Sequence, residues 1–79
     1  MQVTNAIKKL NKSGFVVNST GNRYSAKKSG MKDVIEFITQ DQSVLFINLR
    51  SETDHSDSMN DYHAGVLCDN LTQALQLAR

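Results

Sequence analysis

The side chains most able to do chemistry gather in one polar stretch near the end of the 79-residue chain. An EF-hand calcium loop does not fit there, because the third position counted from Asp57 is Met59 and the twelfth is Cys68. No HExxH or CxxC motif is present. We therefore expect a solvated acidic loop with no metal and no cofactor. Its carboxylates and imidazoles, which at other spacings could bind a divalent cation, are Asp54, His55, Asp57, Asp61 and His63.

Cys68 is the single cysteine, so no intramolecular disulfide can form. Nucleophilic catalysis would need a base beside it. His63 lies five residues earlier, so on one strand the two side chains would point to opposite faces. We expect a structural cysteine and a protein that is not an enzyme.

The opening residues lack the basic start and long apolar run of a secretory signal. Together with the lone thiol, this predicts a cytoplasmic location. The longest apolar run, residues 44–47, is far too short to span a bilayer, so no membrane association is expected.

Charge is unevenly distributed along the chain. Residues 1–32 contain seven cations and no acid, whereas residues 33–79 contain all eight acids and two arginines. Such asymmetry favours an interaction surface, because complementary charge steers association. The residues that we expect to contact a partner are Arg23, Lys27, Lys28 and Lys32 on the basic side, and Asp54, Asp57 and Asp61 on the acidic side.

Hydrophobic spacing predicts a single α+β domain over residues 1–79. Val3, Ala6 and Leu10 form one apolar stripe of a helix that Gly14 ends, and Asn70 is placed to cap a closing helix. Between them we expect strands at residues 15–18, 23–27, 33–39 and 43–50, with an optional fifth at 62–68. Short turns favour an antiparallel meander of order α-β-β-β-β-(β)-α, with both helices on one sheet face.

The second sheet face should then stay partly open, and it is where we expect a partner. The leading hypothesis is a non-enzymatic module that binds another protein. A possible homodimer, joined through the same charge asymmetry, is a variant of it. The alternative is a small nucleic-acid-binding protein that tracks phosphates with its basic half and stacks Tyr24 on a base. In a further alternative, the basic and acidic halves neutralise each other within the molecule.

The stretch from Asp54 to Gly65 (DHSDSMNDYHAG), followed by Asn70 to Leu75 (NLTQAL), resembles a recurring module of small α+β proteins of phages and mobile elements. Proteins of this kind include anti-CRISPR and other anti-defence inhibitors. The resemblance covers the last third of the chain. It implies an inhibitor that occupies the surface of a host complex, such as a nucleoprotein, and it assigns no functional residue.

Overall fold

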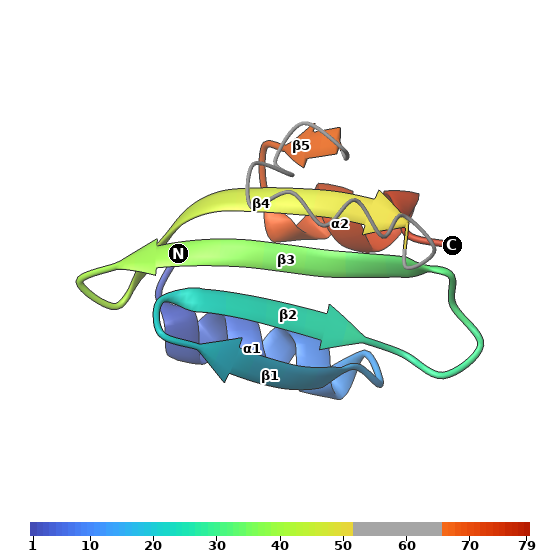
Figure 1. The fold of residues 1–79 in the computed structure, drawn as a ribbon, viewed down its shortest axis with the longest axis horizontal. Helices are drawn as coiled ribbons and strands as arrows, with labels where there is room; N and C mark the ends of the chain where they lie inside the picture. Colours follow the sequence, from blue (N-terminus) through green and yellow to red (C-terminus); the bar gives the residue numbers. More distant parts are fainter. Residues whose placement is uncertain (52–65) are drawn as a thin grey trace.

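The computed structural model describes residues 1–51 and 66–79 and has an α+β architecture, as the sequence predicts. Five antiparallel strands form a meander in the order β1-β2-β3-β4-β5, and one helix lies at each end of the chain (Figure 1). The elements are α1 (Val3–Lys12), β1 (Val16–Thr20), β2 (Arg23–Lys27), β3 (Asp33–Gln40), β4 (Ser43–Ser51), β5 (Val66–Cys68) and α2 (Leu71–Leu77).

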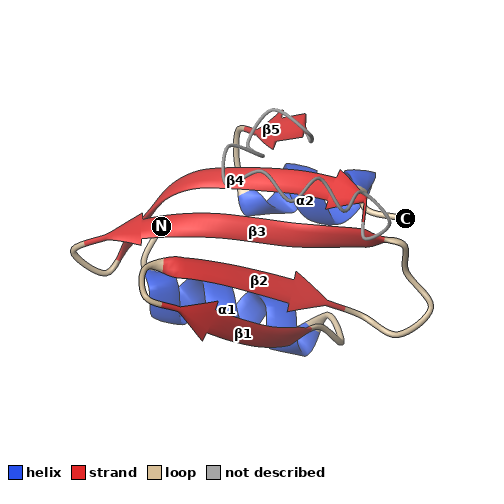
Figure 2. Cartoon of the chain, viewed as in Figure 1, coloured by secondary structure: helices blue, strands red, loops and turns tan. Residues whose placement is uncertain are grey.

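Both helices pack on the same face of the sheet, which confirms the predicted two-layer arrangement (Figure 2). Leu10 of α1 and Leu71 of α2 are buried in one cluster with Phe37 of β3. The apolar stripes predicted for the two helices are the sides that face this cluster. A domain of this size has little else to hold it together, because burial of apolar area is the main favourable term in folding.

The helix ends follow the sequence signals in part. Gly14 has φ +92°, the left-handed conformation that glycine adopts at little cost after a helix. Asn70 caps α2, since its Oδ1 accepts a 2.8 Å hydrogen bond from the Gln73 N–H. The Gln73 side chain returns a bond by accepting from the Asp69 N–H. Gln2 occupies the N-cap position of α1 and makes no side-chain capping hydrogen bond.

The first strand is displaced from its predicted position. Residues 15–18 were expected as strand and 19–22 as turn, but β1 runs to Thr20 and Phe15 lies just before it, buried. The polar residues Ser19 and Thr20 extend β1 because only Gly21 and Asn22 are needed to reverse the chain. Gly21, the first of the two, has positive φ, which suits a tight hairpin.

The fifth strand is present as β5 over Val66–Cys68; residues 62–65 of the segment predicted at 62–68 lie outside the described residues. Its register places Cys68 opposite Ile47 and Val66 opposite Leu49, on the helix-covered side. Cys68 packs against the core cluster, whereas Val66 is 57% exposed.

Both ends of the chain are fastened to the middle of the sheet. Gln2 bridges Ser43 at the start of β4, flanked by hydrogen bonds from Val3 N to Gln42 O and from Val44 N to Met1 O. At the other end, the Arg79 carbonyl accepts from the N–H groups of Lys32 and Asp33, and the Arg79 N–H donates to the Asp33 carboxylate.

The turn between β3 and β4 stores strain that one substitution can release. Asp41 and Gln42 have φ values of 52° and 67°, the pattern of a type I′ turn, in which glycine is favoured at the second position. We expect Gln42→Gly to raise the free energy of unfolding by about 1 kcal/mol. For a domain of this size, that corresponds to a rise in melting temperature of about 4–8 °C by calorimetry.

Gln40→Gly is the matched control for this variant, because the same side chain is lost where φ is negative. It should lower stability by about 0.5–1 kcal/mol. A loss of stability in both variants would contradict the assignment of strain to the turn.

Candidate functional site: the open face of the sheet

The face of the sheet opposite the helices carries a mixed set of polar, charged and apolar side chains. Cross-strand pairing arranges these residues in rows that run across the strands. One row is Thr20, Arg23, Ile38 and Phe46; the next is Asn18, Ser25, Glu36, Asn48 and Leu67.

Three large apolar side chains project from this face, and Val16 at its β1 edge is 65% exposed. Phe46 is 56% exposed and Leu67 is 60% exposed. Phe46 lies on this face because it alternates in phase with Asn48 and Arg50. A bulge directly precedes it: Ile38 pairs with Phe46 and Thr39 pairs with Val44, which leaves Leu45 as the extra residue. The exposed aromatic ring is therefore a product of the local strand geometry.

An ion pair occupies the centre of the face. Arg50 Nε donates to Glu36 Oε1 at 2.7 Å, and both side chains are largely shielded from solvent. In the register of β3 and β4, Val34 is opposite Arg50 and Glu36 is opposite Asn48. The Glu36–Arg50 ion pair therefore runs diagonally between the two strands. Val34 was predicted to face outward with Glu36; it lies on that face but is only 1% exposed, next to the ion pair.

Asn48 is a buried amide on this face. Its side chain is 2% exposed, and neither Oδ1 nor Nδ2 has a hydrogen-bond partner in the part of the chain described. It lines a cavity of about 10 Å³ with Arg23, Glu36 and Phe46. A space of that size holds about one water molecule, which could satisfy the amide.

The predicted basic contact residues lie on and beside the open face. Arg23 and Lys27 are on β2, with side chains on the side opposite the buried Ala26. Lys28 follows β2, and its ammonium lies 5.8 Å from the centre of the Phe15 ring. Lys32 directly precedes β3 and is exposed. The predicted acidic contacts, Asp54, Asp57 and Asp61, lie outside the described residues.

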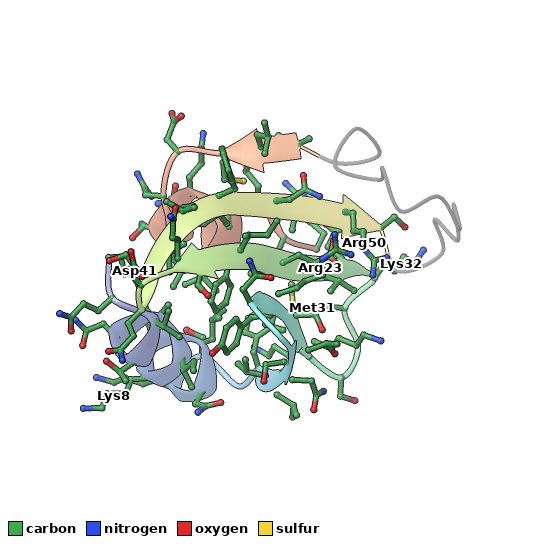
Figure 3. The ribbon with its side chains drawn as sticks, turned by 60° about the vertical axis from the view of Figure 1, so that its left-hand side comes forward. Lys8, Arg23, Met31, Lys32, Asp41 and Arg50 are labelled. Carbon is green, nitrogen blue, oxygen red and sulfur yellow. The ribbon has the colours of Figure 1, made fainter. Side chains whose placement is uncertain are left out.

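The remaining lysines of the basic half lie on the opposite side of the sheet, because α1 covers that side. Lys9 Nζ donates to Thr72 Oγ1 at 2.6 Å and so links α1 to α2. In Figure 3, Lys8 on α1 lies far from Arg23, Lys32 and Arg50. The cations of residues 1–32 therefore form no single continuous surface.

Tyr24 faces the helix-covered side of β2 and stacks on Phe37, with ring centroids 4.9 Å apart and planes 2° apart. One face of the tyrosine ring is thus occupied within the protein. The aromatic side chain that the sheet offers on its open face is Phe46, which the sequence reasoning did not select. The sequence contains a signal for the outward position of Phe46. Phe46, Asn48 and Arg50 alternate with Ile47 and Leu49, and the polar residues Asn48 and Arg50 indicate which face of the strand points outward.

The environment of Cys68 favours the protonated thiol. Its thiol is half-buried and lies 3.7 Å from the Val66 carbonyl oxygen. Burial raises the pKa of the Cys68 thiol, and the charge of Asp69 raises it further. A raised pKa lowers the thiolate fraction at neutral pH, whereas catalytic cysteines need the opposite.

A groove of about 380 Å³ lies between the start of α1, the start of β2 and the end of β3. Its walls contain no carboxylate, imidazole, amine or thiol. The hydroxyl of Thr39, which lines it, already donates to the Asn22 carbonyl oxygen. The lining residues are Gln2, Val3, Thr4, Ile7, Tyr24, Thr39 and Gln42.

No group of three or more histidine, cysteine, aspartate or glutamate side chains within residues 1–51 and 66–79 is placed to hold a metal ion. Neither of the two helices described has the length and apolar composition that a bilayer crossing requires. Comparison of the chain with protein-family models, with curated proteins and with solved structures finds no match in any of the three.

The reactivity of Cys68 gives a test of its environment. Because the pKa is raised, iodoacetamide at pH 8 should alkylate folded protein more slowly than urea-unfolded protein. Asp69→Asn removes one of the two causes and should increase the rate without reaching that of the unfolded chain. A folded thiol that reacts as fast as the unfolded one would contradict the assignment.

The same shift has a consequence for stability. The folded state favours the protonated thiol, and this preference contributes to the free energy of unfolding. The contribution is complete below the ordinary pKa of 9.0 and is lost as pH rises through the higher pKa of the folded state. Urea titrations should show wild type losing more stability between pH 8 and 10 than Cys68→Ser.

Proposed function

We propose that this protein is a non-enzymatic protein-binding module that contacts its partner with the open face of the sheet, centred on Phe46. The observation that carries the proposal is the position of that ring. It is more than half exposed, on a rigid strand, in a row with Arg23 and Ile38. Exposed aromatic and arginine side chains are enriched at the centres of protein interfaces.

The composition of the face favours a protein over a nucleic acid. Glu36 lies at the centre of the sheet face and already engages Arg50, so that the guanidinium there is not available to a phosphate backbone through Nε. The α1 cations Lys8 and Lys12 belong to the helix layer on the other side of the sheet, so they add no charge to this face. Tyr24, the predicted base-stacking residue, is engaged by Phe37.

The absence of catalytic geometry in the described part of the chain supports a binding role. Cys68 has a raised pKa, and the groove beside α1 has no acid–base group other than a tyrosine hydroxyl. The narrower prediction, an inhibitor of the anti-CRISPR type that occupies a host defence complex, depends only on the sequence resemblance and stays a prediction.

The test compares Phe46→Ala with a matched truncation elsewhere. Leu77 on α2 is also exposed, at 44%, but lies on the helix side, so Leu77→Ala is the control. We expect Phe46→Ala to weaken partner capture from nuclease-treated host lysate by about 30-fold, the effect of losing a hot spot of about 2 kcal/mol. Leu77→Ala should leave capture unchanged, and calorimetry should show both variants folded.

Equal capture by wild type and Phe46→Ala would overturn the proposal for this face. Capture that disappears on nuclease treatment would instead support the nucleic-acid alternative. Sedimentation of the purified protein separates the homodimer variant, in which Phe46→Ala would convert a dimer to a monomer.

A further inference from the structure

The two edges of the sheet are finished differently. On one side the last strand is β5, which has three described residues, and Gln2 bridges Ser43 at the start of β4. On the other side, β1 is the last of the described strands and pairs with β2. Among residues 1–51 and 66–79, no strand lies beside its outer row of backbone N–H and C=O groups.

β1 also lacks the features that usually protect an edge. The strand is Val16-Val17-Asn18-Ser19-Thr20, with no charge and no proline, and its register with β2 is regular throughout. Natural edges are normally blunted by lysine, proline, a bulge or a covering segment. Val16 is 65% exposed at the start of the strand.

The hairpin fixes which backbone groups point outward. Two residues join β1 to β2, so Thr20 and Arg23 form a hydrogen-bonded pair, and such pairs alternate along the ladder. The N–H and C=O groups of Val17 and Ser19 therefore point away from β2. They are the positions where an added strand would form its first hydrogen bonds.

The elements that form and adjoin this edge in the sequence, α1, β1 and β2, carry only positive side-chain charges. The elements α1, β1 and β2 and the turns that join them belong to residues 1–32, which contain seven cations and no carboxylate side chain. Lys27 is opposite Val16, and Arg23 is opposite Thr20, on the open face. A strand added beside β1 would lie about 10 Å from β2, within reach of acidic side chains extended toward those cations.

We propose that β1 is a docking strand to which an extended acidic segment of another protein adds as a sixth strand. Backbone hydrogen bonds to Val17 and Ser19 would supply the pairing, and the cations would select acidic side chains. A second copy is a poorer occupant, because β1 against β1 would bring two acid-free halves together. The proposal builds on a protein-binding role but uses an edge, not the Phe46 face.

The test uses two seven-residue peptides in which valine alternates with either glutamate or lysine. With isotope-labelled protein, the glutamate peptide should shift the amide signals of Val17 and Ser19 and slow their hydrogen exchange. It should bind at least tenfold more tightly than the lysine peptide, and less tightly as salt rises. Equal binding of the two peptides, or shifts confined to other elements, would overturn the proposal.

Ser19→Pro removes an outward N–H without removing a bond to β2, which edge strands tolerate. It should reduce glutamate-peptide binding at least tenfold, whereas Ser19→Thr should retain it. Binding that Ser19→Pro leaves unchanged, or a wild-type dimer that Ser19→Pro dissociates, would also overturn the proposal. Phe46→Ala should bind the peptide normally, so failure here and failure at the Phe46 face are distinguishable.

Discussion

The structure depends on burying one face of a five-stranded sheet under two short helices. Leu10, Phe37 and Leu71 meet in that layer, and the chain has neither a disulfide nor a described metal-ligand cluster to add to it. Because both helices pack on one face of the sheet, the side chains of the other face must themselves be compatible with contact with water. The Glu36–Arg50 pair meets this requirement at the centre of the face. Phe46 instead exposes an apolar ring to solvent, and for this reason it is the residue on the open face that points most directly to a partner.

Much of the fold could be predicted because its signals are local. The helix stripe through Val3, Ala6 and Leu10, the left-handed Gly14 and the Asn70–Gln73 cap each depend on residues a few positions apart. The meander follows from short turns. The position of β1 was missed, because Ser19 and Thr20 read as turn residues although they form strand pairs with Tyr24 and Arg23. Pairing with β2, a tertiary effect, overrides their weak local preference.

The candidate site was harder to predict because it depends on which elements share a side. The nucleic-acid alternative treats the cations of residues 1–32 as one surface. The sheet separates Lys8 and Lys12 on α1 from Arg23 and Lys27 on β2. Tyr24 was chosen for its type, but its strand parity turns it toward Phe37. The bulge at Leu45 shifts Val44 relative to the later residues of β4, so alternation predicts the faces from Phe46 onward but not across the whole strand. Partner-contact predictions therefore need the register, not only the composition.

The attachments of the two chain ends have a mechanical consequence. Residue 2 is bonded at the start of β4 and residue 79 at the start of β3. These strands are antiparallel neighbours, so their starts lie at opposite ends of the sheet (Figure 1). A pulling force applied through the two ends would act along the strands and load the hydrogen bonds between β3 and β4 together, in shear. Unzipping them one by one would require pulling from a different pair of points.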